Sequence, residues 1–288
     1  MGGLGNQMFQ YAAARRLAVI NRTTMKMDLG FLLDRTPREN FFYRNYQLNL
    51  FNIQERIADP DEAAFYSGKQ TGFFNKCMAR LKTRNLLGKP VHIYEPHFHF
   101  YPELLFAPEN SYLEGYWQSE KYFKEIETVI RAEFTFKNDL DEKARELASR
   151  IQSVNSLCIH VRRCDFVGNP THGVMGVKYY QDGVNILTGI ISSLQIFVFS
   201  DDIPWCKQNL VFQVPTFFIE DDNAGEKLGD HLHLMTLCKY FIIPNSAFGW
   251  WAAWLCSFPD KIIIAPKQWF LIVQHNTRDL IPDQWIRI

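Results

Sequence analysis

The fold of this chain is decided by the stretch Leu157–Asp165, LCIHVRRCD. Its apolar part, Leu157–Val161, predicts a short buried strand, and Arg162 and Arg163 follow directly at the C-terminal end of that strand. Two adjacent guanidinium groups are costly to bury without an anionic partner, and their planar forks match phosphate oxygens. Two interpretations are open on these residues alone. They form a diphosphate clamp in which Asp165 orients one arginine, or a surface strand end whose arginines pair with local acids.

The composition is that of a globular protein. The 288 residues are 47% hydrophobic and 15% aromatic, which suits one large domain or two medium ones. The formal net charge of zero excludes a nucleic-acid binder that acts through bulk positive charge. Six scattered cysteines without a CxxC pair indicate free thiols in a reducing compartment. Because no apolar stretch reaches transmembrane length and no signal peptide is recognisable, we expect a cytoplasmic protein, with peripheral attachment to the inner membrane left open.

The second half alternates short apolar runs with helix-like segments. The expected strands are 157–161, 196–199, 216–219, 240–243 and 261–265, and the expected helices are 177–192, 203–210, 229–238 and 247–257. This alternation predicts a parallel sheet with right-handed crossovers. Polar or charged residues follow every strand but the last, and ligands of such sheets bind beyond the carboxyl ends of the strands. Since these groups are expected to share one crevice, the pattern favours the diphosphate clamp of a nucleotide-sugar site.

Each polar group of this crevice has a chemically plausible role. Ser246, at the start of the last expected helix, could donate its hydroxyl and N–H to a phosphate oxygen. Asp230, or Asp201 and Asp202, could accept hydrogen bonds from a purine or from ribose hydroxyls. Coordination of Mg²⁺ by the acids of 200–202 or 220–222 is the rival interpretation. We disfavour the metal because the two arginines already supply the positive charge that a leaving diphosphate needs.

The first half opens with a glycine turn, MGGLGN, and the helix-like segment Gln7–Val19. A glycine turn before a helix offers free N–H groups to an anion or a sugar, and it normally follows a strand. Almost nothing precedes it here, so we expect that the first strand is missing from this chain or that the true start lies upstream. Thr24–Asp28 predicts a short strand that ends in an acid, and Phe73–Leu87 predicts a helix with a solvated basic face.

Three further segments of this half carry alternative interpretations. His92, His97 and His99 lie close together, where alternating aromatics favour a strand with outward imidazoles over a metal site. In Leu113–Phe123, the run Trp117–Glu120 suits a carbohydrate platform, or Ser119 caps the start of a helix. An amphipathic helix over 137–152 precedes the segment SVNS, which predicts a domain boundary at 152/153.

Four blocks of sequence resemble those of a known enzyme family: GGLGNQMFQYA at 2–12, HVRRCDFVGNP at 160–170, FSDD at 199–202 and NSAFGWWAAWL at 245–255. GYWQSEKYF at 115–123 adds to them. In these blocks the chain is similar to the α-1,2-fucosyltransferases of glycosyltransferase family eleven, in their bacterial form. The resemblance implies a GT-B-like α/β fold of two Rossmann-like domains, 1–152 and 153–288, that face a cleft. It also implies GDP-β-L-fucose as sugar donor, no metal or other cofactor, and inverting transfer to the 2-hydroxyl of a galactose-terminated glycan.

The resemblance also implies roles for single residues. Arg162 would bind phosphate with support from Arg163, while His160 and Asp165 would shape the guanosine and phosphate pocket. Together, resemblance and chemistry assign Arg162, Arg163 and Asn6 to catalysis; His160, Asp165, Asp201, Asp202, Asp230, Asn245, Ser246, Ala247, Gly5 and Gln7 to binding the sugar donor; and Trp117, Gln118, Glu120 and Asp28 to binding the acceptor. His172, Glu120 and Asp28 are candidates for a weak base.

The chain departs from the family pattern at Cys164, Gly249 and Ala252, where glycine, serine and glycine are usual. Two rival functions stay open beside transfer to a galactoside 2-hydroxyl. One is a fucosyltransferase with another acceptor hydroxyl or a peptide acceptor. The other is a module that binds a nucleotide sugar or a glycan without turnover.

Overall fold

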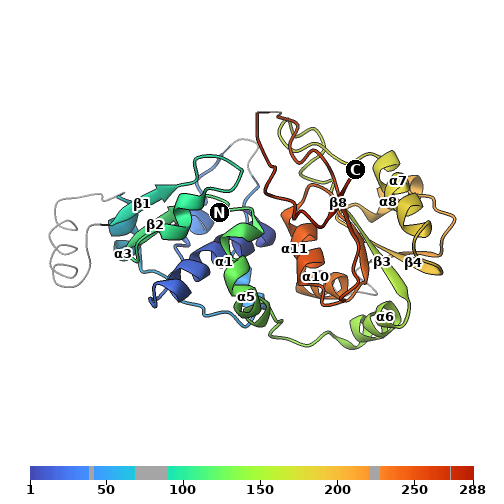
Figure 1. The fold of residues 1–288 in the computed structure, drawn as a ribbon, viewed down its shortest axis with the longest axis horizontal. Coiled ribbons are helices and arrows are strands. Elements are labelled where there is room, and N and C mark those ends of the chain that lie inside the picture. Colours follow the sequence, from blue (N-terminus) through green and yellow to red (C-terminus); the bar gives the residue numbers. More distant parts are fainter. Residues whose placement is uncertain (39–41, 69–89, 221–227, 273) are drawn as a thin grey trace. The chain divides into compact units, whose positions relative to one another are not determined.

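The computed structural model describes residues 1–38, 42–68, 90–220, 228–272 and 274–288. The chain forms two compact units, drawn in Figure 1: unit 1 is Met1–Thr135 with Arg278–Leu280, and unit 2 is Phe136–Thr277 with Ile281–Ile288. The units divide at 135/136, whereas the sequence analysis expects 152/153. The reason is helix α6 (Glu142–Ser153), whose buried residues Ala144, Ala148 and Ile151 lie on the side that packs against strand β3 and helix α10 of unit 2.

Unit 2 is a parallel α/β sheet with helices. Its elements are α6, β3 (Asn155–Val161), α7 (Val177–Thr188), β4 (Leu194–Ser200), α8 (Ile203–Asn209), β5 (Thr216–Phe218), α10 (Leu228–Thr236), β6 (Tyr240–Ile242), α11 (Ala247–Leu255), β7 (Ile263–Ala265) and β8 (Ile286–Arg287). The six strands pair in the order β5-β4-β3-β6-β7-β8, and all pairs are parallel. The α/β class with a parallel sheet in the C-terminal half is therefore confirmed. Strand β8 is the one strand of this sheet that the sequence analysis did not expect.

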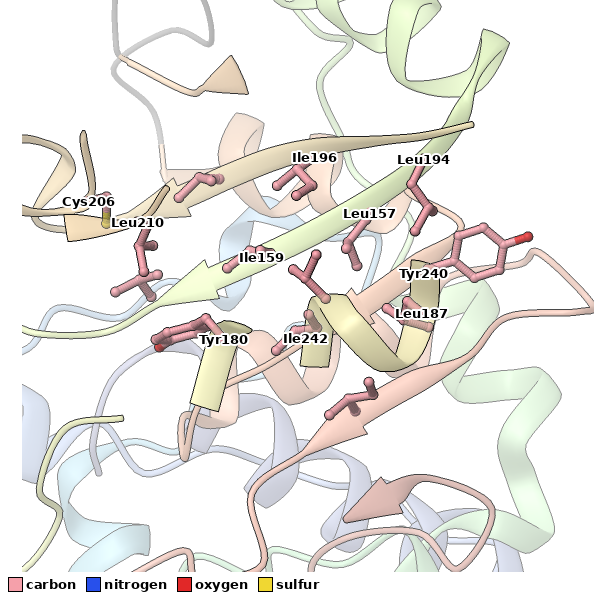
Figure 2. Packing of buried hydrophobic residues seen from close by; sticks show 14 residues of the cluster. Leu157, Ile159, Tyr180, Leu187, Leu194, Ile196, Cys206, Leu210, Tyr240 and Ile242 are labelled. Carbon is pink, nitrogen blue, oxygen red and sulfur yellow. The ribbon is translucent and has the colours of Figure 1, made fainter. Parts of the chain in front are cut away.

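The core of unit 2 lies between this sheet and its helices. Figure 2 shows Leu157 and Ile159 of β3 facing Tyr180 and Leu187 of α7, and all four side chains are fully buried. Burying an aliphatic or aromatic side chain of this size contributes about 1.5–3 kcal/mol. Helix α7 comes close to the sheet at Gly183, where a Cβ would lie 2.8 Å from Cδ1 of Ile242. This packing fixes β3 at the centre of the sheet.

The strand order contains a switch point beside β3. From β3 the chain moves outward to β4 and β5, and it then returns to place β6 on the other side of β3. Ligands of open parallel sheets bind outside the carboxyl ends of the strands at such a point. The residues that follow β3, β4 and β6 therefore form the candidate site.

Unit 1 is richer in helical turns than in strands. Its elements are α1 (Leu4–Ile20), α2 (Gly30–Leu33), η1 (Leu48–Leu50), α3 (Pro60–Ser67), β1 (Val91–Tyr94), η2 (Pro102–Phe106), β2 (Ser111–Glu114), η3 (Glu120–Tyr122), η4 (Lys124–Ile126) and α5 (Glu127–Glu133). Helix α1 is fixed to α5 by a polar cluster: Tyr11 donates to Glu133 at 2.7 Å, and Arg15 forms an ion pair with the same carboxylate at 2.8 Å. In the described residues of this unit, parallel pairing consists of β1 with β2 and the bridge Met27–Ile57.

Several expectations for unit 1 change in the structure. Helix α1 begins at Leu4 and not at Gln7, and Thr24–Asp28 contributes one bridge residue where a strand is expected. Strand β1 includes His92, whereas His97 and His99 follow it and stack ring on ring with centroids 3.3 Å apart. The helix expected over 73–87 lies outside the described residues. No helix in the described ranges is long and apolar enough to cross a membrane.

Candidate active site

Arg162 leaves the end of β3 and is held between two carboxylates. Its NH2 group lies 2.5 Å from Oδ1 of Asp165, and its NH1 group lies 3.0 Å from Oδ2 of Asp201. The guanidinium carbon is also 5.7 Å from the ring centre of Phe166. The prediction that Asp165 orients one arginine agrees with this geometry. A guanidinium has five N–H donors, so these two contacts leave others for an anionic ligand.

Arg163 is fixed by a different set of partners. Its Nε donates to Oδ2 of Asp202 at 3.0 Å, and its guanidinium carbon lies 3.9 Å from the ring centre of Trp205. The same Asp202 caps helix α8, because its Oδ1 accepts from the N–H of Trp205 at 3.1 Å. Among the described residues, no hydrogen bond engages the terminal amino groups of Arg163. The stacked and capped geometry therefore presents these groups in one orientation.

Asp201 anchors the loop that carries both arginines. Its carboxylate accepts from the N–H groups of Arg163 at 2.8 Å and Cys164 at 3.2 Å, in addition to the ion pair with Arg162. The sequence analysis assigns Asp201 and Asp202 to hydrogen bonds with a purine or ribose. This assignment stays a prediction; in the structure the oxygens of both carboxylates hold the arginines and the start of α8. The geometry therefore contains both interpretations of the arginine pair. Local acids pair with Arg162 and Arg163, and the remaining N–H groups of the two guanidinium groups are available for a phosphate.

His160 lies on β3 two residues before Arg162 and is 6% exposed. The pKa of His160 is lowered to about 3, chiefly by burial and to a smaller extent by the nearby charges of Arg162 and His231. The imidazole is therefore neutral at pH 7. Its Nδ1 has no hydrogen-bond partner in the described part of the chain and faces Gly249, where a Cβ would lie 2.6 Å away. A buried neutral ring at this position packs against α11 and adds no charge to the site.

The end of β6 contributes Asn245, Ser246 and Ala247. The side-chain amide of Asn245 donates to the carbonyls of His172 at 2.7 Å and Trp269 at 2.9 Å, so it ties two loops together. Its Oδ1 atom has no hydrogen-bond partner among the described residues, and the role of Asn245 in sugar-donor binding stays a prediction. Ser246 precedes α11, of which Ala247 is the first residue, and its hydroxyl makes no capping hydrogen bond there. The first N–H groups of this nine-residue helix are oriented to bind an anion.

Two more residues of unit 2 lie near these strand ends. Asp230 is a buried carboxylate in the first turn of α10. His172 follows β3, and its ring stacks on Phe166 at 4.6 Å between centroids. Burial lowers the pKa of His172, the charge of Asp165 opposes that shift, and Arg162 adds to it. His172 is therefore a neutral imidazole close to the Arg162–Asp165 pair.

In unit 1, the glycine turn and the start of α1 hold three predicted residues. Gly5 and Asn6 lie in the first turn of α1, and Oδ1 of Asn6 accepts from Nε2 of Gln118 at 2.7 Å. The amide of Gln7 donates to the carbonyls of Gly2 and Asn45, and its oxygen accepts from the N–H of Gln47. The amide of Gln7 thus fixes the neighbouring chain segment, and its contact with the sugar donor stays a prediction.

The predicted carbohydrate platform is closed in the structure. Trp117 is 1% exposed, and its ring meets Tyr122 edge to face with centroids 5.7 Å apart. Ser119 accepts from the N–H of Lys121 at 3.3 Å and so caps the turn η3. Gln118 is buried, and Glu120 pairs with Lys124 at 3.4 Å. The structure of this segment matches the alternative interpretation, a helical turn capped by Ser119. Trp117 does not present an open aromatic face to a sugar.

Asp28 lies at a cavity of about 520 Å³ within unit 1, which Trp117 also lines. One carboxylate oxygen of Asp28 accepts from the hydroxyl of Tyr112 at 2.7 Å, and the other accepts from the N–H of Gly30 at 2.7 Å. Within the described ranges, no group of three His, Cys, Asp or Glu side chains has the arrangement of a metal site. Sequence reasoning missed Tyr112. It also missed Trp205, because an aromatic ring three residues beyond an acid has no recognisable motif.

Comparison with known proteins places this site in a family. The model of Glycosyl transferase family 11 matches residues 98–288. The chain belongs to glycosyltransferase family 11. It is 33% identical to an alpha-1,2-colitosyltransferase of Escherichia coli over 100% of this chain and 96% of that protein. It is 30% identical to the O-antigen biosynthesis glycosyltransferase WbnK of E. coli over 100% of this chain and 98% of that protein.

More distant relatives also match. A galactoside alpha-(1,2)-fucosyltransferase 1 of Leontocebus fuscicollis is 25% identical over 61% of this chain and 52% of its own length. Among solved structures, the NodZ alpha-1,6-fucosyltransferase soaked with GDP-fucose covers 88% of this chain and 89% of its own, at 16% identity and a TM-score of 0.49. The resemblance noted in the sequence is thus confirmed at the level of the family. This family 11 chain is a glycosyltransferase.

Proposed function

We propose that this chain transfers L-fucose from GDP-β-L-fucose to the 2-hydroxyl of a terminal β-galactoside, with inversion at the anomeric carbon. One observation carries the proposal. Arg162 and Arg163 lie at the switch point of the sheet, where three aspartates orient their guanidinium groups. The N–H groups that the aspartates do not bind are available for a ligand. Family membership supports a glycosyl donor with a diphosphate, and this geometry supplies the cations for it.

The diphosphate would lie between the ends of β3 and β6. These two strands are adjacent, so the loop that carries Arg162 and the first turn of α11 follow neighbouring strand ends. The terminal amino groups of Arg163, the remaining N–H groups of Arg162 and the hydroxyl of Ser246 are the proposed ligands. Asp230, buried in the first turn of α10, is the proposed partner of the guanine N–H groups.

The proposed reaction is a single displacement. The acceptor oxygen attacks the anomeric carbon of fucose while the bond from that carbon to the β-phosphate oxygen breaks, and the electron pair leaves with GDP. Charge grows on the leaving phosphate in the transition state, where the arginines stabilise it most. The proton of the acceptor hydroxyl passes to a weak base. We favour His172 over Glu120 and Asp28, because it is neutral and lies beside the Arg162–Asp165 pair.

Assays of turnover test this proposal. GDP release from GDP-fucose, measured with and without lactose, should rise with lactose, and NMR of the product should show an α-1,2 linkage. Arg162→Ala should lower kcat by about 10²- to 10³-fold, the scale for losing one oxyanion donor. Arg145→Ala, an exposed arginine on α6, is the matched control and should keep the full rate. Near-normal turnover by Arg162→Ala would contradict the proposal. If the unaltered protein binds GDP-fucose but forms no product, the rival function, a binding module without turnover, is the correct one.

A second candidate differs only in the sugar donor. The relative at 33% identity is named an alpha-1,2-colitosyltransferase, and colitose is L-fucose without its 3-hydroxyl. A site that hydrogen-bonds the 3-hydroxyl rejects a sugar that lacks it much more strongly than an apolar site rejects a sugar that carries it. Parallel kcat/KM measurements with GDP-fucose and GDP-colitose decide between the two donors.

The acceptor and the location in the cell are also proposals. We place acceptor specificity in the first half of the chain. A screen of galactose-terminated glycans and peptides with GDP-fucose shows which of these acceptors the enzyme uses. A cytoplasmic location remains our expectation, with peripheral attachment to the inner membrane as the alternative. Fractionation of cells, with salt extraction of the membrane fraction, tests this expectation.

A further inference from the structure

One face of the short sheet in unit 1 carries aromatic and acidic side chains. Strands β1 and β2 run parallel (Figure 1), with His92 paired to Tyr112 and Tyr94 paired to Glu114. Side chains alternate along a strand, and residues that pair across two strands share a face of the sheet. These four side chains therefore lie on one face, to which we refer as the aromatic face.

The rings of the aromatic face pack on one another and leave Tyr94 open to solvent. The imidazole of His92 stacks on the ring of Tyr94 with centroids 3.9 Å apart, and it meets the ring of Tyr112 edge to face at 4.9 Å. His92 thereby covers one side of the Tyr94 ring. Because Tyr94 is nevertheless 61% exposed, the other side of its ring faces solvent. The stack holds this ring in place as an apolar platform.

Hydrogen-bonding groups surround this platform. Nε2 of His92 lies 3.0 Å from Oε2 of Glu114, and the hydroxyl of Tyr112 donates to Oδ2 of the exposed Asp28 at 2.7 Å. Asp28, Tyr112 and Glu114 also line the cavity of unit 1, so the aromatic face borders a recessed surface. A carboxylate has about four acceptor sites, so both acids can accept hydrogen bonds from a ligand in addition to those within the protein.

The open ring and one of the acids lie where parallel strands end. Tyr94 and Glu114 are the last residues of β1 and β2, and ligands of open parallel sheets bind beyond the carboxyl ends of the strands. Glu95, the next residue, has a different role: its two carboxylate oxygens accept from the N–H groups of Tyr116 at 2.7 Å and Trp117 at 2.9 Å. The strand ends therefore present Tyr94 and Glu114 to a ligand, whereas Glu95 fixes the turn that follows β2.

We propose that the aromatic face binds one sugar residue of the acceptor glycan. The apolar side of the sugar ring would lie on the open side of Tyr94, and its hydroxyls would donate to Glu114 and Asp28. A neutral glycan fits this chemistry, because two carboxylates repel the phosphates of a nucleotide. The inference rests on the proposed transfer to a galactoside, for which it names the residues of unit 1 that hold the acceptor.

Binding of lactose in the absence of GDP-fucose tests the site. An NMR titration measures the Kd, which should rise about two- to tenfold in Tyr94→Ala, the change that corresponds to a lost aromatic contact. Tyr94→Phe keeps the ring and should bind lactose as the unaltered protein does. The matched control is Phe106→Ala, which removes an 85% exposed ring elsewhere in unit 1 and should leave the Kd unchanged.

Kinetics separate a contact with the sugar from a structural effect. Tyr94→Ala should raise the KM for lactose by a similar factor and leave kcat and the KM for GDP-fucose unchanged, as expected when only binding of the acceptor is lost. Equal Kd values for lactose in Tyr94→Ala and the unaltered protein would overturn the proposal, and so would a failure of the unaltered protein to bind lactose. If Tyr94→Ala weakens lactose binding but the unaltered protein transfers no fucose, the sugar site stands and only the proposed function is wrong.

Discussion

The guanidinium carbon of Arg163 lies 3.9 Å from the ring centre of Trp205, and Asp202 contacts both residues by accepting from Nε of Arg163 and from the N–H of Trp205. Indole and carboxylate together hold the guanidinium in one orientation. A cation over an indole face contributes about 0.5–2 kcal/mol. Trp205 is thus a positioning residue for the arginine clamp, and it should affect nucleotide binding without touching the nucleotide.

Replacing Trp205 tests this role. Trp205→Leu should raise the Kd for GDP about two- to thirtyfold, the change that corresponds to the lost cation–ring contact. Trp205→Phe keeps an aromatic face and should lose less affinity. Calorimetric titration with GDP measures both variants. If Trp205→Leu binds GDP as tightly as the unaltered protein, the stacked geometry has no role in the clamp.

Asp201 is expected to matter for stability as well as for binding. Asp201→Asn removes the charge that pairs with Arg162 and weakens two main-chain hydrogen bonds, so the free energy of unfolding should fall by about 1–3 kcal/mol. The matched control is Asp182→Asn, whose carboxylate pairs with Lys178 on the surface and should change stability by less than about 0.5 kcal/mol. Urea unfolding of the two variants gives both numbers. Equal losses would show that Asp201 is no more than a surface acid.

Gly249 is required for packing against His160. A Cβ at this position would lie 2.6 Å from Nδ1 of the buried imidazole, so Gly249→Ala should destabilise the protein by about 1 kcal/mol or more, although alanine is the better helix former. In Gly189→Ala the nearest atom to the new Cβ is a carbonyl oxygen at 3.4 Å. That control should keep or raise Tm in a thermal melt. A Tm for Gly249→Ala at or above that of the unaltered protein would show that the His160 ring can move.

The buried imidazole of His160 predicts a pH dependence of stability. Its pKa is about 3 in the folded protein and about 6.5 when unfolded, so the unfolded state binds the extra proton between these values. Stability should therefore fall as pH drops below about 6.5, by about 1.4 kcal/mol per pH unit from this group. His172 and His233, whose pKa values burial also lowers, act in the same direction.

Urea unfolding between pH 5 and 7.5 measures this slope. His160→Gln removes the titrating group and should flatten the slope by about one proton. An unaltered slope in His160→Gln would mean that other groups account for the acid sensitivity.

Turnover should not require a divalent cation. Two arginines supply the positive charge for the leaving diphosphate, and the carboxylates of Asp201 and Asp202 are already engaged by main-chain N–H groups and guanidinium groups. We expect the rate of GDP release to survive EDTA. Loss of the rate on chelation, with recovery on addition of Mg²⁺ or Mn²⁺, would restore the carboxylate–metal interpretation.

The arrangement of unit 2 could be predicted from the sequence because its strands are buried on both faces. Such strands read as continuous apolar runs, as in Leu157–Val161, and the polar residues after them mark the carboxyl edge of the sheet. Unit 1 could be predicted less well. Thr24–Asp28 has the pattern of a strand, yet one edge of it has no strand partner among the described residues, so the pattern yields a single bridge. The expected cleft between the two domains stays a prediction.

The sequence by itself determined the family, the parallel sheet and the arginine pair at its centre, because these depend on local pattern and on residue type. Only the tertiary structure decided what the neighbouring polar groups do. Asp201, Asn245 and Gln7 look like ligand-binding residues in the sequence, and each also bonds a main-chain group far along the chain: Cys164 at 37 residues, His172 at 73 and Asn45 at 38. Local pattern carries no record of such partners, and a side chain whose hydrogen bonds are used within the protein has few left for a substrate.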